Sequence, residues 1–168
     1  MGEEKSKLHW GHINVNVRDL DMAIRFYEKL GFSIFIPGIP YLGLNQEPPA
    51  QEIPKQGALA LGLEVPASGR GCIMQLGNGF PMLDLTELSL PGGSAPLSTR
   101  DRGLVRICLA SQDLERDHAR LVKEGVEFLS PPKAGTGGSA KIAVCKDPDG
   151  TLIELIEINL ELWSTLTH

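Results

Sequence analysis

The stretch His12-Ile-Asn-Val-Asn-Val-Arg-Asp19-Leu20, followed by a helical segment that stops at Gly31, decides the fold because it occurs twice. The second copy is Arg106-Ile-Cys-Leu-Ala-Ser-Gln-Asp113-Leu114, followed by a segment that stops at Gly125. The aspartates, leucines and glycines of the two copies all correspond at one offset of 94 residues. A repeat at so long a period predicts two copies of one small module rather than a solenoid.

The beginning of each module has a recognisable pattern. His12, Asn14 and Asn16 alternate with apolar residues, which predicts a half-buried strand with a polar second face. Asp19 is suited to cap the helix that follows, and the glycine that closes the segment is suited to end it. The second copy repeats this order of strand, turn, helix and glycine.

The ends of the modules also match. Residues 82–88, Met-Leu-Asp-Leu-Thr-Glu-Leu, resemble residues 152–158, Leu-Ile-Glu-Leu-Ile-Glu-Ile, with Asp84 opposite Glu154. The offset here is 70 residues, so the first module carries 24 more residues before its last strand. The excess lies in a Pro-rich insertion at about residues 37–70. Such a segment predicts a long loop that acts as a lid or a binding wall.

These patterns predict the domain organisation of the whole chain. It comprises a first module at 8–90 with the insertion at about 37–70, a linker at 91–102, a second module at 103–158 and a tail at 159–168.

Composition excludes several classes of function. The net charge of the 168 residues is -5, which argues against nucleic acid as a partner. No apolar run approaches the roughly 18 residues that a membrane span needs, and the first residues lack an apolar secretion segment. Three widely spaced cysteines suit the reducing cytoplasm better than a disulfide framework. We therefore expect a cytoplasmic protein that binds neither membrane nor nucleic acid.

Three motifs together resemble the vicinal oxygen chelate superfamily. They are the opening stretch from His12 to Leu20, the helix end Phe26-Tyr-Glu-Lys-Leu-Gly-Phe32 and the closing Asp147-Pro-Asp-Gly-Thr-Leu-Ile-Glu-Leu155. This superfamily includes glyoxalase I, extradiol dioxygenases, acyl-CoA epimerases, fosfomycin-modifying enzymes and bleomycin-binding proteins. The resemblance implies an α+β fold of two tandem βαβββ modules, whose mixed sheets curl into a cup, usually within a homodimer.

The resemblance also implies which residues face the cup. Metal-dependent members place four ligands there, at positions held here by His12, Asp84, Arg106 and Glu154. His12 and Glu154 are good ligands for a divalent metal, and Asp84 is an acceptable one, although Glu87 lies close enough to be confused with it. Arg106 departs from the pattern, since a guanidinium stays cationic and has no lone pair to offer.

Three interpretations of these residues remain open. In the first, Arg106 only forms a salt bridge with buried carboxylates. In the second, the site holds no metal, Arg106 stabilises an anionic oxygen, and His12 with a carboxylate such as Glu154 moves a proton. In the third, His12, Asp84 and Glu154 still hold iron, manganese or zinc.

Further side chains are candidates for contact with a ligand. Asn14 and Asn16 share the face of His12, Cys108 shares that of Arg106, Asp84 lies in the last strand, and Tyr41 lies in the insertion. We expect a protein that handles a small oxygen-bearing organic molecule by lyase-like or isomerase-like chemistry without a cofactor. The alternatives are a binding protein similar to the bleomycin-sequestering members, and a metal-dependent lyase or dioxygenase.

Overall fold

The computed structural model describes residues 8–90 and 92–161. Within them the chain forms two compact units with an α+β architecture. Unit 1 contains the described residues up to Ile24 and from Gly31 to Gly92. Unit 2 contains Arg25–Leu30 and the described residues from Gly93 onward.

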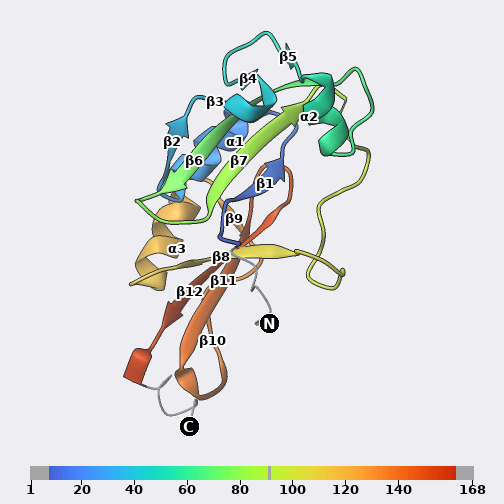
Figure 1. Cartoon of the computed structure of the whole chain (residues 1–168). Helices are drawn as coiled ribbons and strands as arrows, with labels where there is room; N and C mark the ends of the chain where they lie inside the picture. The colour runs from blue at the N-terminus through green and yellow to red at the C-terminus, as the bar shows by residue number, and fades with distance from the viewer. Residues whose placement is uncertain (1–7, 91, 162–168) are drawn as a thin grey trace, which may run out of the picture. The chain divides into compact units, whose positions relative to one another are not determined.

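Unit 1 is built on a five-stranded mixed sheet (Figure 1). Its main path runs β1-β7-β6-β2, and β5 pairs with β6. The β1–β7 pair is parallel and the other pairs are antiparallel. The strands are β1 (His12–Asn16), β2 (Phe32–Ile36), β5 (Gln51–Glu52), β6 (Ser68–Leu76) and β7 (Met82–Leu88).

Unit 2 repeats this plan with a second five-stranded mixed sheet. The path is β10-β11-β12-β8, with β9 also paired to β11, and the first and last strands of the module, β8 and β12, are again parallel. The strands are β8 (Arg106–Ala110), β9 (Glu127–Phe128), β10 (Lys133–Ala134), β11 (Ala140–Lys146) and β12 (Leu152–Ile158). The tandem βαβββ order expected from the sequence is confirmed.

The two long helices begin and end in the same way, α1 (Leu20–Lys29) in the first module and α3 (Leu114–Lys123) in the second. The Asp19 carboxylate accepts a hydrogen bond from the Met22 amide at 2.8 Å, and Asp113 accepts one from the Arg116 amide at 3.0 Å. Both contacts satisfy amides of the first helical turn, which have no partner within the helix.

The glycines after these helices have the left-handed conformation that ends a helix, with φ of 100° at Gly31 and 85° at Gly125. A second cap comes from the last strand of each module. Glu87 accepts a hydrogen bond from the Leu20 amide at 2.6 Å, and Glu157 accepts one from the Leu114 amide at 2.7 Å. Glu87 and Glu157 differ by the offset of 70 residues, so the repeat extends to the closing strands.

Each helix covers the apolar face of a sheet. In unit 1, Leu20 and Ala23 are fully buried together with Leu85, Cys72 and Met74 of the sheet. In unit 2 the buried set comprises Leu114 and Leu121 of α3 with Ala143, Cys145, Ile153 and Leu155 of β11 and β12. Burying one large aliphatic side chain stabilises a fold by about 1.5–3 kcal/mol, and each unit buries several such side chains in a core of its own.

The insertion is ordered, whereas its composition predicted an irregular loop. It contains β3 (Gly38–Ile39), the 3-10 helix η1 (Pro40–Leu42), β4 (Leu44–Asn45) and α2 (Lys55–Ala60) besides β5. The reason is a small apolar core of its own, made of Ile39, Leu42, Leu44, Ile53 and Ala58. In unit 2, the segment at 130–139 includes β10 and a second 3-10 helix, η2 (Thr136–Gly138).

The second half of α1 belongs to unit 2, where Tyr27 makes a buried polar contact. Its hydroxyl donates a hydrogen bond to the Asp147 carboxylate at 3.1 Å, and both residues are at most 4% exposed. The other carboxylate oxygen of Asp147 accepts the amides of Asp149 and Thr151 at 2.9 and 2.8 Å. In the part of the chain that the structure describes, no helix is long and apolar enough to cross a membrane.

Candidate functional site

The polar face of the unit 1 sheet is formed by its two parallel strands. In the register of β1 and β7, Asn14 lies beside Asp84 and Asn16 lies beside Thr86. Side chains that are register partners, or two residues apart in a strand, share a face. His12 therefore lies on this face too, as its alternating pattern predicted.

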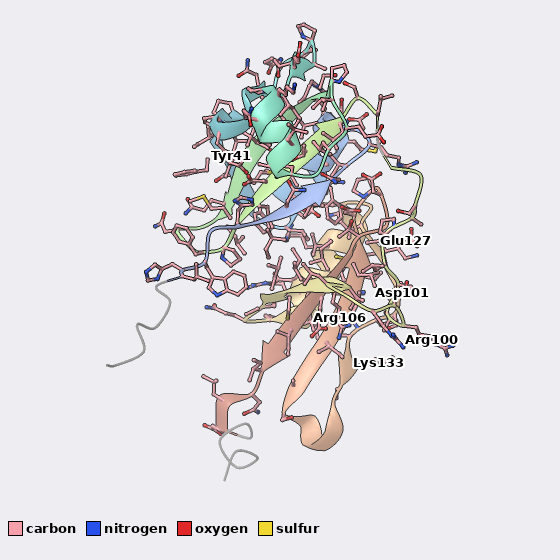
Figure 2. The ribbon with its side chains drawn as sticks, turned by 45° about the vertical axis from the view of Figure 1, so that its right-hand side comes forward. Tyr41, Arg100, Asp101, Arg106, Glu127 and Lys133 are labelled. Carbon is pink, nitrogen blue, oxygen red and sulfur yellow. The ribbon has the colours of Figure 1, made fainter. Side chains whose placement is uncertain are left out.

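Tyr41 completes a cluster on this face. The η1 helix carries it, and its neighbour Leu42 is buried in the core of the insertion (Figure 2 labels Tyr41). The Tyr41 hydroxyl donates a short hydrogen bond to Asp84 Oδ2 and lies 3.4 Å from His12 Nε2. His12 Nε2 lies 3.6 Å from the same Asp84 oxygen. The rings of His12 and Tyr41 stack with their centroids 5.8 Å apart. We call His12, Tyr41 and Asp84 the proton cluster.

Within the proton cluster, the Asp84 side chain is buried, whereas the side chains of His12 and Tyr41 are accessible. The Asp84 side chain is 1% exposed, whereas that of His12 is 40% exposed and Tyr41 is 56% exposed. Burial, the hydrogen bond to Asp84 and its charge all raise the pKa of Tyr41, so the phenol keeps its proton at neutral pH. Asp84 Oδ1 is buried and has no hydrogen-bond partner within residues 8–90 and 92–161. Such an atom costs about 1–3 kcal/mol, so its retention needs a reason other than stability.

Asn14 forms hydrogen bonds with Asn16 and with Thr86, a residue that sequence reasoning missed. Asn14 Nδ2 donates to Asn16 Oδ1, and Thr86 Oγ1 donates to Asn14 Oδ1, both at 2.9 Å. Thr86 follows Asp84 by two positions, so strand alternation was the signal that could have identified it.

The equivalent place in unit 2 holds Arg106 and Glu154. Arg106 Nε donates to Glu154 Oε2 at 2.5 Å, and the side chains are 37% and 14% exposed (Arg106 is labelled in Figure 2). The two Nη groups of Arg106 make no hydrogen bond within the described residues. Each module thus pairs a basic residue of its first strand with a carboxylate of its last strand, His12 with Asp84 and Arg106 with Glu154.

Cys108 lies next to Glu154 in the register of β8 and β12, and its Sγ is 3.7 Å from Glu154 Oε1. Burial and the neighbouring Glu154 charge raise the pKa of the Cys108 thiol to about 11. A thiol that stays protonated at neutral pH is a poor nucleophile, so Cys108 can contact a ligand but is not an activated thiolate.

The choice between Asp84 and Glu87 is settled by the faces of β7. The two residues are three positions apart and point to opposite sides of the sheet. Glu87 caps α1 and binds Arg70 Nη2 at 2.9 Å on the helix side. Although burial raises the pKa of Glu87, the hydrogen bonds from Arg70 and the Leu20 amide lower it further, leaving it below its ordinary value. Asp84 is therefore the counterpart of Glu154.

The resemblance to metal-dependent proteins implies four ligand positions, which are held here by His12, Asp84, Arg106 and Glu154. These four residues do not fit a four-ligand metal centre. Arg106 has no lone pair for a metal, and its guanidinium already binds the Glu154 carboxylate. Among residues 8–90 and 92–161, no group of three or more His, Cys, Asp or Glu side chains is arranged to hold a metal ion.

Comparison with known proteins identifies the family of this chain. A family profile described as the Glyoxalase/Bleomycin resistance protein/Dioxygenase superfamily matches residues 9–155. The chain belongs to this superfamily. No curated protein matches the sequence significantly.

Solved structures share the fold. A glyoxalase family protein from Bacillus cereus is 18% identical with a TM-score of 0.72, covering 94% of this chain and 99% of its own. A superfamily member from Sphaerobacter thermophilus is 21% identical with a TM-score of 0.58, covering 89% and 98%. A glyoxalase I mutant from Zea mays is 22% identical with a TM-score of 0.58, covering 86% of this chain but 43% of its own. At these identities the likeness concerns the fold alone.

Proposed function

We propose that this protein handles a small oxygen-bearing organic molecule by proton transfer, in the manner of a lyase or isomerase, with His12 as the base. One observation supports this most directly: a buried carboxylate, Asp84, lies against two accessible groups that can carry protons, His12 and Tyr41. A base held by a second side chain, itself anchored, is the arrangement that general acid–base catalysis requires.

The geometry suggests how the proton would move. With its Nε2 proton directed to the Asp84 carboxylate, His12 presents the lone pair of Nδ1, which has no partner among the described residues. Nδ1 would take a proton from a carbon next to a carbonyl group, and the Asp84 charge would stabilise the imidazolium that forms. The exposed ring of Tyr41 would contact the substrate while its hydroxyl holds Asp84 in place.

Arg106 is the proposed stabiliser of negative charge, and Glu154 orients it. The guanidinium uses one N–H on Glu154, and its Nη groups, which make no hydrogen bond within the described residues, can donate to an anionic oxygen such as that of a carboxylate. Asn14, Asn16 and Cys108 are proposed ligand contacts. We also propose that the protein works in the cytoplasm as a homodimer, without a resident metal.

The test uses exchange with deuterated water. Wild-type protein is incubated with small carbonyl compounds that carry a proton on the adjacent carbon, and deuterium incorporation is followed by NMR. His12→Ala should slow incorporation by about 10²-fold or more, the usual share of a general base. Asp84→Asn, which keeps the side-chain volume but removes the counter-ion, should slow it as well. His9→Ala is the matched control, since His9 is an exposed histidine outside the strands, and should leave the rate unchanged.

The second candidate is a binding protein that performs no chemistry. The mutual hydrogen bonds of Asn14, Asn16 and Thr86 favour it, because they form a neutral polar surface that suits recognition. Retention of a compound without deuterium incorporation in any variant would support this candidate over the acid–base one.

A further inference from the structure

We propose that the exposed face of the unit 2 sheet binds a small carboxylic acid with an apolar chain, the carboxylate at Arg106 and the chain along β11 and β12. The inference rests on the proposed function, since it takes Arg106 to hold an anionic oxygen, and it names the class of molecule held.

Strand register arranges this face in rows from charged to apolar. Arg106 and Lys146 are both register partners of Leu152, so they end one row across β8, β12 and β11. The second row consists of Cys108, Glu154 and Val144. The third row, four residues beyond Arg106 along β8, consists of Ala110, Ile156 and Ile142. At about 3.3 Å per residue the first and third rows lie about 13 Å apart. One end of the face is thus basic and the other aliphatic.

The apolar end is open. Ile142 is 39% exposed, Ile158 is 37% exposed, and Ile156 and Val144 are half-buried. On the opposite face of the same strands, Ala143, Cys145, Ile153 and Leu155 are at most 6% exposed under α3. An aliphatic chain on the open side would bury surface that water now covers, at about 25 cal/mol for each Å².

At the basic end of the face, Arg106 has hydrogen-bond donors that no other described residue uses. Lys146 forms an ion pair with Glu127 at 3.2 Å, whereas Arg106 gives Glu154 its Nε–H alone. The planar fork of the Nη groups matches a carboxylate, which accepts two parallel hydrogen bonds. A carboxylic acid with an aliphatic chain satisfies both ends of the face, whereas an alcohol of equal length or a short acid satisfies only one.

The unit 1 face makes a contrast that supports this assignment. There the corresponding positions are occupied by polar side chains, including Asn14, Asn16 and Thr86, which hydrogen-bond to one another. Their counterparts in the second module by the offsets of 94 and 70 residues are Cys108, Ala110 and Ile156. The second sheet therefore carries apolar side chains at the positions where the first sheet carries these polar ones.

The test is titration of the full chain with octanoate, octanol and propanoate, with amide shifts followed by NMR. We expect octanoate to bind most tightly and to shift residues 106–110, 142–146 and 152–158. Arg106→Met should weaken octanoate binding about tenfold or more and leave octanol binding unchanged. Glu154→Gln should strengthen it, because a competing carboxylate is removed. Ile156→Asn should weaken octanoate binding but not propanoate binding.

Lys141→Met is the matched control, since Lys141 lies in β11 on the opposite face, and should bind octanoate as wild type does. The inference is overturned if Arg106→Met and Glu154→Gln both bind octanoate like wild type. It is also overturned if this face is covered by a second copy of the chain, seen as protection of the same residues on dimerisation. Octanoate binding that depends on Arg106, together with unaltered deuterium exchange in His12→Ala, would leave this inference standing and refute the acid–base proposal. Octanoate binding that does not depend on Arg106, together with slowed deuterium exchange in His12→Ala, would refute this inference and leave the acid–base proposal standing.

Discussion

Replacing Tyr27 by Phe should destabilise the protein by about 1.5–3 kcal/mol at neutral pH, the range for a hydrogen bond to a charged group. The Tyr27 ring is fully buried and stays so in Phe, so the change removes only the hydroxyl. That hydroxyl donates to Asp147, whose carboxylate is 4% exposed. At about 2–4 °C per kcal/mol for a chain of this size, the melting temperature should fall by about 3–12 °C.

The effect should depend on pH, because the other partner is titratable. Burial raises the pKa of Asp147, and its hydrogen bonds from Thr151 and Tyr27 lower it only in part. The folded chain therefore binds more protons than the unfolded chain just above pH 3.9, the ordinary value for Asp, and stability falls as pH rises through this interval. Loss of the hydroxyl raises the folded pKa further, so the penalty of Tyr27→Phe should be small in acid and reach its full size only above that pKa.

Urea unfolding at a series of pH values measures this difference. Phe26→Leu, a change in a neighbouring ring without a hydroxyl, is the control, and its penalty should not vary with pH. A Tyr27→Phe variant as stable as wild type at pH 7, or one whose penalty grows in acid, would refute the reasoning.

Three further outcomes are expected. Gly31→Ala and Gly125→Ala should each destabilise by about 1–3 kcal/mol in urea unfolding, because φ is 100° at Gly31 and 85° at Gly125; equal stability of either variant and wild type would show that the glycine is not required. Glu87→Gln should be less stable than wild type at pH 7, and because the pKa of Glu87 is lowered on folding, the difference should shrink as pH falls through that pKa; a difference that widens in acid would contradict this. Cys108, with its pKa raised to about 11, should react slowly with iodoacetamide at pH 7 and faster as pH approaches that value; fast labelling at pH 7 would contradict a thiol that stays protonated beside Glu154.

The repeat made much of the fold predictable. The Asp19 and Asp113 caps, the Gly31 and Gly125 stops and the closing strands are local features, and local features follow from residue type and periodicity. The insertion was not predictable in this way. Its many prolines indicated a loop, but scattered apolar residues between them come together in a small core, and such contacts have no periodic signature.

The candidate site was predictable to the same degree. Alternation along β1 identified His12, Asn14 and Asn16 on one face, and the second offset identified Asp84 and Glu154. That Tyr41 would reach Asp84 depends on how the insertion folds over β7, which sequence spacing does not encode. The second cap of each long helix, by Glu87 and Glu157, was missed because it joins residues far apart in the chain.

We propose that the basic residue Arg106 stands where the resemblance to metal-dependent proteins implies a ligand, and that proton transfer depends on His12 and not on an ion. Elemental analysis of protein purified without chelator tests it most directly, with His12→Ala as the comparison. We expect the wild type and His12→Ala alike to carry far less than one equivalent of iron, manganese or zinc. One tightly held ion per wild-type chain, lost on replacing His12, would contradict the claim.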